Sequence, residues 1–381
     1  MDFNLTDEQE ILRQSVREFA ENEIKPHREE LDLKEEFGYE ITQKMFDMGF
    51  FGVVIPPEYG GMGMDYLSYI IVVEELSRVD GCQGATVAAA NSLGSSPIHQ
   101  YGSEEQKKEL LPELVTSKLW GFGLTEPNAG SDAGGTQTTA VKKGDKWILN
   151  GSKIFITNAA TDITLGSTIQ AVSGQRPDGK KEYTCFIVRQ DTPGYTARAM
   201  HKKMTWRSSN TSEIYLEDVE LNDDNILGKR GEGFHQMLET LDSGRLSIAA
   251  MGLGGAQGAF EAALAYSKER QQFGRPIGKF QTIAFKLADM ATEIEAARNL
   301  LYKACWLKDN GKPFGKEAAM AKLYCSEVMK RAADSGVQIY GGYGLMEEYP
   351  MAKFYRDQRL LEIGEGTSEM QRLVISRKLG L

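Results

Sequence analysis

A change of sequence pattern near residue 120, reversed near residue 230, constrains the fold of this 381-residue chain more than any other feature. Between these points short apolar runs alternate with turn residues, as in "SEIYLEDVEL", and this pattern predicts strands. On both sides apolar residues recur at helical spacing. Helices, then strands, then helices fit neither a doubly wound sheet nor a repeat array. We therefore predict an α+β fold, mainly α, with helical residues 1–119, a β domain at 120–230 and helical residues 231–381.

Local signals place the expected helices and one hairpin. Thr6 and Gln9 have the spacing of a capping box, and Pro26 ends the first helical run. The pair Asn150–Gly151 lies between two β-rich runs and predicts a hairpin turn. Further helices are expected at residues 40–48, 66–78, 104–117, 237–251, 256–269, 280–309, 316–340 and 369–378.

Charge and residue spacing argue against several classes of protein. The formal charge is -10 and there is no basic stripe, so nucleic-acid binding is not expected. No apolar run is long enough to span a bilayer, and the acidic start "MDFNLTDEQE" differs from a signal peptide. We therefore expect a cytoplasmic protein that does not bind a membrane. Four separated cysteines predict reduced thiols, and the single E-x-x-H pair, Glu232 and His235, predicts no metal site.

The glycines of "MGLGGAQGAF" resemble a dinucleotide fingerprint but do not match it. Gly252, Gly254 and Gly258 give G-x-G-x-x-x-G, which has one residue too many, and no strand precedes them. Small residues in a helical pattern instead predict that two helices approach each other closely. A nicotinamide-binding domain is rejected on this basis.

Four further segments each have a functional and a purely structural interpretation. "LTEPNAGSDAGG" (124–135) is either an anion- or ring-binding loop or a surface turn. Arg270 in "ERQQFGRPIGKFQ" either clamps a phosphate or caps a helix together with Gly274. "QIYGGYG" (338–344) is a glycine-rich turn that is either part of a binding site or a plain helix C-cap. In "LEIGEGTSE", Glu365 lies between two glycines and is either part of an acidic turn or a base that needs open space.

These segments occur in the order seen in the acyl-CoA dehydrogenase family, which the chain resembles over nearly its whole length. The resemblance also includes "NGSKIFITNA", "KMTWRSSNTSEIYLEDVEL" and "GEGTSEMQR". It implies an N-terminal helical domain, a middle β-barrel or sandwich domain and a C-terminal four-helix bundle, assembled as a homotetramer. It also implies FAD, an acyl-CoA substrate and an electron-transferring flavoprotein as acceptor. The alternatives are an enoyl-CoA reductase, an oxidase, or a non-catalytic relative that binds acyl-CoA.

The resemblance assigns roles to individual residues. Glu365 matches the family's base, which removes the α-proton while the β-hydrogen leaves as hydride to flavin N5. In some members the base lies instead on a helix of the C-terminal domain, where this chain has Gly244. Residues that match the substrate side are Ser131, Asp242, Arg245, Gly364 and Gly366. Residues that match FAD contacts are Phe122, Leu124, Thr125, Ser131, Phe155, Thr157, Arg270, Phe273, Gln281, Gln338, Gly341, Gly342, Thr367 and Glu369, with Arg270, Phe273, Gln281, Gln338, Gly341 and Gly342 reaching the FAD of a neighbouring subunit.

One position departs from the pattern of many straight-chain members. They have tyrosine directly before the base, whereas this chain has Gly364. Loss of the ring would widen the acyl pocket, which suggests a short branched, cyclic or otherwise bulky acyl group. The alternative is that another side chain fills the gap.

Overall fold

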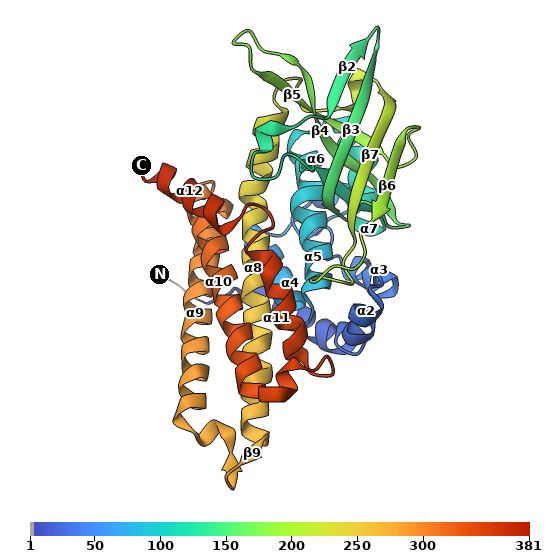
Figure 1. Cartoon of the computed structure of the whole chain (residues 1–381). Coiled ribbons are helices and arrows are strands. Elements are labelled where there is room, and N and C mark those ends of the chain that lie inside the picture. The colour runs from blue at the N-terminus through green and yellow to red at the C-terminus, as the bar shows by residue number, and fades with distance from the viewer. Residues whose placement is uncertain (1–3) are drawn as a thin grey trace.

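The structure is a computed structural model that describes residues 4–381, so residues 1–3 of the expected N-terminal domain lie outside it. Long helices form the body, and the sheet lies at one end of it (Figure 1). The N-terminal helices are α1 (Asp7–Phe19), η1 (Ala20–Ile24), α2 (Arg28–Lys34), α3 (Tyr39–Asp47), η2 (Pro57–Tyr59), α4 (Tyr66–Val79), α5 (Gly81–Ala89), η3 (Ala90–Ser95), α6 (Ser96–Tyr101) and α7 (Glu104–Thr116).

The remaining elements continue the predicted order. The strands, with two 3-10 turns, are β1 (Leu119–Gly123), η4 (Ala133–Gly135), β2 (Thr139–Lys143), β3 (Lys146–Thr157), β4 (Thr164–Gln175), β5 (Lys181–Arg189), β6 (Tyr195–Ala199), β7 (Thr211–Leu221), η5 (Asp223–Asn225) and β8 (Ile226–Leu227). The C-terminal elements are α8 (Gly233–Glu269), β9 (Gln271–Gln272), β10 (Arg275–Pro276), η6 (Ile277–Lys279), α9 (Gln281–Asp309), α10 (Gly315–Tyr340), η7 (Gly341–Leu345), α11 (Pro350–Leu361) and α12 (Ser368–Lys378). The fold class is confirmed, whereas the domain boundaries at residues 119 and 230 stay a prediction.

The predicted start of the first helix is confirmed. The amide of Gln9 donates to Thr6 Oγ1 at 3.2 Å, and the amide of Thr6 donates to Gln9 Oε1 at 3.1 Å. This exchange satisfies two backbone donors that the first turn leaves free. The helix continues through one π-helical turn and ends before Pro26.

The sheet has eight strands in the order β6-β7-β3-β2-β4-β5-β8, with β1 paired to β4 in parallel. Its core contains Trp147 and Leu149 at alternating positions of β3, Ile214 of β7, and Phe186 in the continuously buried part of β5. Strand β1 is buried along its whole length. The loop that follows β1 is therefore anchored in the interior.

The predicted hairpin at Asn150–Gly151 is wrong, because β3 runs through both residues. The pairing of β3 with β7 shifts register between Leu149 and Gly151, which marks a β-bulge. Gly151 has φ +150°, and a Cβ there would lie 2.5 Å from Thr138 Oγ1. A bulge and a hairpin both use glycine, so the local signal is the same. The turn between β2 and β3 lies instead at Gly144, with φ +62°.

Helix α8 is one helix of 37 residues rather than the two that were predicted. Its glycines lie against α4: a Cβ at Gly254 would lie 2.1 Å from Glu74 O, and one at Gly258 would lie 2.0 Å from Arg78 O. The prediction of close helix approach is confirmed. Packing against α4 and α10 outweighs the low helix propensity of glycine. Helices α2 and α11 were not predicted.

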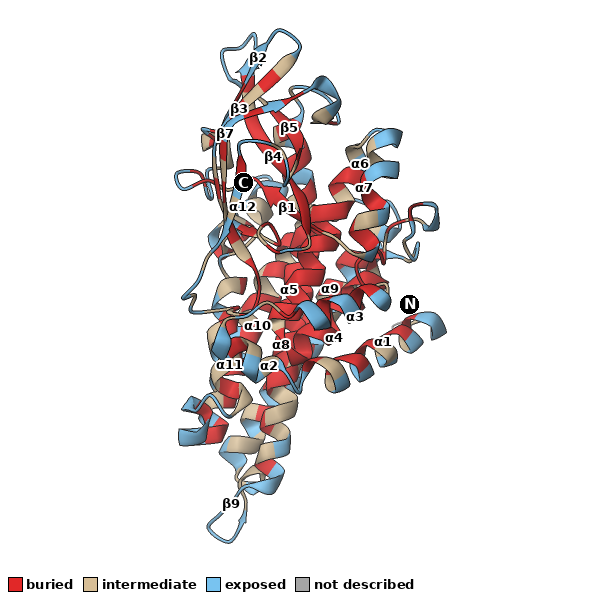
Figure 2. Cartoon of the chain, turned by 90° about the vertical axis from the view of Figure 1, so that its right-hand side faces the viewer, coloured by how far each residue is buried: buried red, intermediate tan, exposed pale blue. Residues whose placement is uncertain are grey.

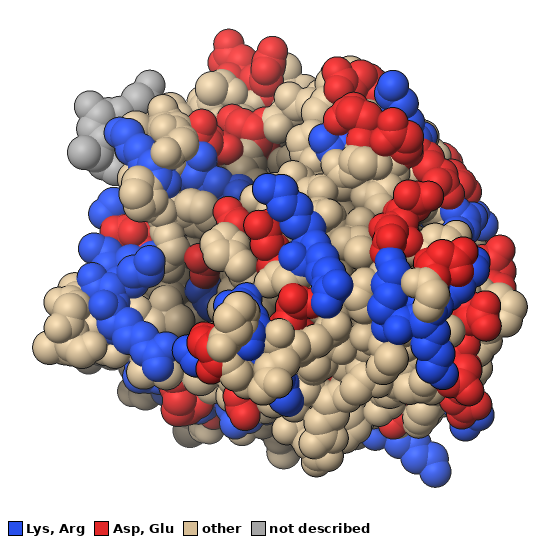
Figure 3. All heavy atoms as spheres, turned by 90° about the horizontal axis from the view of Figure 1, so that it is seen from above, with Lys and Arg blue, Asp and Glu red and all other residues tan. Residues whose placement is uncertain are grey.

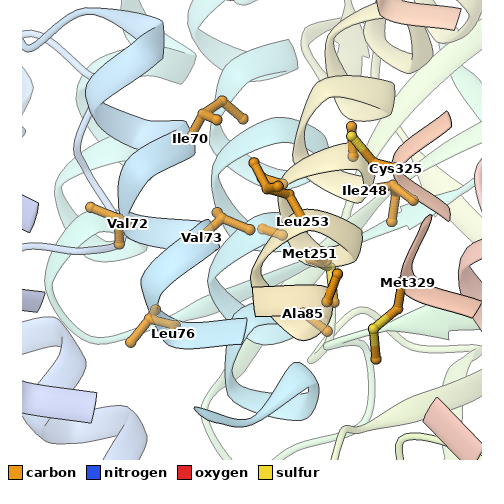
Figure 4. Packing of buried hydrophobic residues seen from close by; sticks show 14 of the residues in the cluster. Ile70, Val72, Val73, Leu76, Ala85, Ile248, Met251, Leu253, Cys325 and Met329 are labelled. Carbon is orange, nitrogen blue, oxygen red and sulfur yellow. The ribbon is translucent and has the colours of Figure 1, made fainter. Parts of the chain in front are cut away.

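The main core lies where α8 packs between α4 and α10. Val73 of α4 points toward Leu253 of α8, while Cys325 and Met329 of α10 lie on the other side of α8 (Figure 4). Buried residues dominate the middle of the molecule, and exposed residues gather at its two ends (Figure 2). This core holds the three helices in a fixed relation to one another.

Charged side chains of both signs are spread over the face seen from above, with uncharged surface between them (Figure 3). Many charged side chains of the chain are paired, for example Arg230 with Glu182 at 2.7 Å. Within residues 4–381, no helix combines the length and the apolar character needed to cross a membrane.

Candidate active site

Glu365 lies in the short connection between α11 and α12, in an uncommon backbone conformation. Its φ is +50°, and that of Gly366 is +94°. A non-glycine residue at positive φ is strained, and such strain gathers at functional sites. Backbone bonds hold the turn on both sides: the amide of Gly364 donates to Leu360 O at 2.8 Å, and the amide of Ser368 to Glu362 O at 3.0 Å.

The carboxylate of Glu365 lies over Gly244 of α8. A Cβ built at Gly244 would lie 2.1 Å from Glu365 Oε2 and 3.4 Å from Leu93 Cδ2. The absence of a side chain at Gly244 therefore makes room for Glu365. The position that could have held an alternative base is the position that the Glu365 carboxylate now covers.

The environment of Glu365 favours a base that works near neutral pH. Its Oε2 atom is buried and has no hydrogen-bond partner among the described residues. Burial raises the pKa of Glu365 to about 7, although Lys322 and then Arg245 act in the opposite direction. A carboxylate with a pKa near 7 takes up a proton more readily than an ordinary one.

Two basic side chains face this carboxylate. Lys322 of α10 is fully buried, and its Nζ donates to Gly366 O at 2.7 Å. Burial lowers the pKa of Lys322 to about 8, against the pull of Glu365. Arg245 of α8 is buried as well and pairs with Asp242, three residues earlier. Lys322 was not among the predicted site residues, although it lies at helical spacing from Ala318 and Cys325, which are apolar and buried.

The loop 124–135 is tied to strand β3. The amide of Ile154 donates to Thr125 O at 3.0 Å, and Lys153 Nζ donates to Leu124 O at 3.2 Å. Lys153 also pairs with the buried Glu126 at 2.7 Å. The structure therefore brings Leu124 and Thr125 beside the strand that carries Phe155 and Thr157. The buried pair Glu126–Lys153, which sequence reasoning missed, folds this loop.

Phe155 is held outward in a strained conformation. Its φ is +60° and its side chain is 62% exposed. A large ring kept exposed at positive φ is typical of a binding surface rather than of a core. The strand continues through Thr157 to Asn158, whose Nδ2 donates to Thr86 O at 3.0 Å. This end of β3 thus lies against α5.

Helix η3 links the strands with the Glu365 side of the site. A Cβ at Gly94 would lie 3.4 Å from Trp120 Cβ on β1, and the neighbouring Leu93 lies beside Gly244. The π-helical form of η3 is of a kind that is frequent at functional sites. Strand β1 and the carboxylate of Glu365 are therefore separated by one short helix.

A second group of predicted residues lies elsewhere, at the β9 end of the helices, opposite to α12 (Figure 1). Arg270, Gly341 and Gly342 line one hollow of about 600 Å³. The Arg270 guanidinium lies 5.5 Å from the centre of the Tyr343 ring. Phe273 is 92% exposed at φ +53°, at the tip of the β9–β10 turn.

The other predicted residues take these positions. Gln281 begins α9 and Gln338 lies in the last turn of α10. Thr367 caps α12, where its Oγ1 accepts from the amide of Met370 at 3.3 Å, and Glu369 is exposed in the first turn. Phe122 is buried in β1, whereas Ser131 is exposed in the loop. The structure thus gathers Asp242, Arg245, Gly364, Gly366 and Thr367 around Glu365, but it does not bring the Arg270 group to them.

Three family models match the chain: the acyl-CoA dehydrogenase N-terminal domain over residues 6–118, the middle domain over 121–219 and the C-terminal domain over 231–380. A probable acyl-CoA dehydrogenase of Bacillus subtilis, YngJ, is 52% identical over 100% of both chains. The solved butyryl-CoA dehydrogenase of Megasphaera elsdenii is 44% identical, with a TM-score of 0.96 and 100% of each chain covered. A chain in a solved structure of the electron transferring flavoprotein of Acidaminococcus fermentans is 46% identical, with a TM-score of 0.96, covering 100% of this chain and 99% of that one.

Proposed function

The chain belongs to the acyl-CoA dehydrogenase family, and from this premise we propose that Glu365 is the base that removes the α-proton of the thioester. The chain is an FAD-dependent enzyme that dehydrogenates an acyl-CoA. One observation carries the assignment of the base: the Oε2 atom of Glu365 is buried, has no partner and lies over Gly244. An acidic turn that served only the fold would leave its carboxylate in water or in an ion pair.

The chemistry explains why such a carboxylate is needed. An α-carbon gives up its proton only when the negative charge that develops on the thioester is stabilised. Glu365 can accept that proton because burial has already raised its pKa to about 7. FAD, when bound, supplies the acceptor for the hydride that leaves the β-carbon.

The residues present fit a flavin dinucleotide, but they form two groups that lie at opposite ends of the molecule. Phe155 offers an exposed ring on β3, the strand that carries Thr157 and that is bonded to Thr125 through Ile154. Arg270 offers a guanidinium next to the open backbone of Gly341 and Gly342, where a Cβ would meet no atom within 4 Å. A guanidinium beside an open glycine backbone suits a pyrophosphate.

We also propose that a second copy of the chain completes the cofactor site. The Arg270 group lies at the opposite end of the helices from α12, so one chain does not present both halves of the site together (Figure 1). This arrangement supports a homo-oligomer, and the homotetramer expected from the family stays a prediction. The similarity to the chain in the Acidaminococcus fermentans structure supports an electron-transferring flavoprotein as acceptor.

A short acyl group is the substrate that we propose. Leu360 lies close to Gly364, since a Cβ there would lie 3.0 Å from Leu360 Cδ2 and that side chain would have to shift slightly. This supports the alternative that another side chain fills the gap left by the missing tyrosine ring. The similarity to the butyryl-CoA dehydrogenase of Megasphaera elsdenii also supports a short acyl group. Anaerobic reduction by butyryl-, isobutyryl- and cyclohexanecarboxyl-CoA tests the proposal, and a preference for the cyclic substrate would contradict it.

The assignment of the base is tested by Glu365→Gln, with Glu362→Gln as the matched control in the same connection. Glu362 pairs with Lys330 and Arg359 and makes no contact with Gly244. We expect Glu365→Gln to bind FAD normally and to lose about 10²–10⁴-fold in the rate of flavin reduction by butyryl-CoA. Exchange of the α-proton in D₂O should fall in parallel. A reduction rate within a few-fold of the unmodified enzyme would refute the role of Glu365.

A further inference from the structure

We propose that Lys322 is a positioning residue for the base: its ammonium group holds the Gly366 carbonyl and supplies a positive charge that acts on Glu365. The inference rests on the proposed function of Glu365. Lys322 lies on α10, 44 residues before Gly366 in the sequence. In this role it acts on the base through the loop and through its charge.

The first observation is how Lys322 is buried. Its side chain is fully inaccessible, which is rare for lysine unless the ammonium group is paired with a carboxylate. Among the ion pairs of residues 4–381, none includes Lys322. Its hydrogen-bond acceptor is the backbone oxygen of Gly366, at 2.7 Å. The buried ammonium group is thus bonded to a carbonyl next to Glu365 and not to a carboxylate. This indicates that Lys322 has a role in the loop that carries Glu365.

The second observation is that α10 holds the loop at both ends. Ser326, one turn after Lys322, donates from Oγ to Leu361 O at 2.9 Å. Leu361 ends α11, and Gly366 directly follows the base. Gln371 adds a second donor to Gly366 O at 2.9 Å. The segment between Leu361 and Gly366 is therefore fixed from one face of α10.

The third observation is that α10 is itself fixed to the helix that carries Gly244. A Cβ at Gly252 of α8 would lie 2.9 Å from Cys325 O, so the two backbones touch. Lys322 thus lies in a rigid frame that relates the Glu365 backbone to the glycine beneath its carboxylate. A misplacement of about 1 Å in such a frame can cost roughly 10²-fold in rate.

The charges around Glu365 show why Lys322 matters for ionisation. Arg245 of α8 also faces the base, but Asp242 pairs with it and offsets its charge. From α4 the nearby groups are Tyr66 and Tyr69, whose pKa values burial raises, so they stay neutral. Lys322 is therefore the less compensated positive charge. It lowers the pKa of Glu365 more than Arg245 does, although burial outweighs both.

This arrangement predicts a specific change in pH dependence. Glu365 must be ionised to accept a proton, so the rate falls on the acid side as pH drops through the pKa of Glu365. Removal of the positive charge at position 322 raises that pKa and moves the acid limb to higher pH. A residue that only packed the loop would lower the rate at every pH and leave the limb where it is.

The experiment uses the FAD-loaded enzyme with butyryl-CoA. The variants are Lys322→Met, Lys322→Arg and, as a control, Lys330→Met. Lys330 is on the same helix and half-exposed, and it pairs with Glu362 at 3.5 Å. The readouts are flavin reduction and α-proton exchange in D₂O between about pH 5.5 and 9.5.

We expect Lys322→Met to move the acid limb upward by about one pH unit and to slow exchange about fivefold at pH 7, with recovery toward pH 9. Lys322→Arg should keep the limb within about 0.3 unit, and Lys330→Met should match the unmodified enzyme. If Lys322→Met does not retain FAD, Lys322→Gln is measured in its place and should show the same shift.

An acid limb that stays in place in the Met or Gln variant would overturn the proposal. So would a shift of equal size in Lys330→Met. Failure of the proposed function has a different signature, because Glu365→Gln would then leave exchange intact whatever the Lys322 variants do.

Discussion

The fully buried Lys322 and the largely buried Lys353 have opposite surroundings. Lys353 of α11 lies among carboxylates, with its Nζ 2.5 Å from Asp357, 3.0 Å from Asp80 and 3.6 Å from Asp32. Burial acts to lower the pKa of Lys353, but Asp357 and Asp80 outweigh it and hold that pKa well above its usual value. Lys322 has no such partners, and burial lowers its pKa to about 8.

The Lys353 cluster joins three parts of the chain. Asp32 belongs to α2, Asp80 lies between α4 and α5, and Asp357 accepts from the amide of Trp206 at 2.8 Å. Cys82 Sγ also lies 3.4 Å from Lys353 Nζ. The ammonium group therefore occupies the centre of a set of residues that could otherwise resemble a metal site.

The contrast separates two uses of buried charge. Around Lys353 every charge has a close opposite, so the cluster fixes the helices to the connection between β6 and β7. Around Glu365 the carboxylate lacks a partner, so its proton affinity is raised and available for chemistry. Paired buried charges hold helices and loops in place, whereas an unpaired buried carboxylate has a raised pKa that suits it to proton transfer.

The largest expected effect tests the paired cluster. Lys353→Met leaves Asp357, Asp80 and Asp32 without their shared partner, and we expect a loss of about 3–5 kcal/mol in the free energy of unfolding. Lys34→Met is the control, because Lys34 pairs with Glu30 at the surface, where water and salt screen the interaction. Denaturant unfolding of both variants at pH 7 measures the difference. Equal stability of the two variants would show that the Lys353 cluster does not stabilise the fold.

A smaller effect, on rate rather than on stability, is expected at Gly244. In Gly244→Ala the new Cβ would lie 2.1 Å from Glu365 Oε2, so the carboxylate must move. We expect the α-proton exchange rate to fall by roughly 10–100-fold. Gly81→Ala is the control, since its Cβ would make an ordinary contact at 3.6 Å with Trp206. Unchanged exchange in Gly244→Ala would mean that Glu365 does not act from this position.

The smallest expected effect is a gain in the free energy of unfolding when Glu365 is replaced, whereas replacing Lys353 lowers it. The pKa of Glu365 is about 7 in the folded chain, against an ordinary value of 4.5 in the unfolded chain. The folded state therefore binds the proton more tightly than the unfolded state does. The ionised carboxylate therefore destabilises the fold fully above about pH 7, and not at all below about pH 4.5. Glu365→Gln should thus gain about 1–2 kcal/mol at pH 8 and lose that gain as the pH falls toward 4.5. Thermal unfolding at both values measures it, and a destabilised variant at pH 8 would contradict the unpartnered state of this carboxylate.

Local signals predicted what short-range physics decides. Thr6 and Gln9 cap the first helix through bonds three residues apart, so their pattern is sufficient. The same reasoning failed at Asn150–Gly151, because the conformation there depends on Thr138, which comes from the neighbouring strand. It also failed at α8, where close packing against α4 keeps a glycine-rich segment helical.

The order of helices and strands, the family and Glu365 as the candidate base could be predicted from the residues alone, since each depends on neighbouring residues or on collinear motifs. The surroundings of that base come from helix packing: the open position at Gly244, the ammonium group of Lys322 and the pairing of Arg245 with Asp242. The reason is physical. A pKa depends on desolvation and on charges a few ångströms away, and these come from α8 and α10, far from Glu365 along the chain.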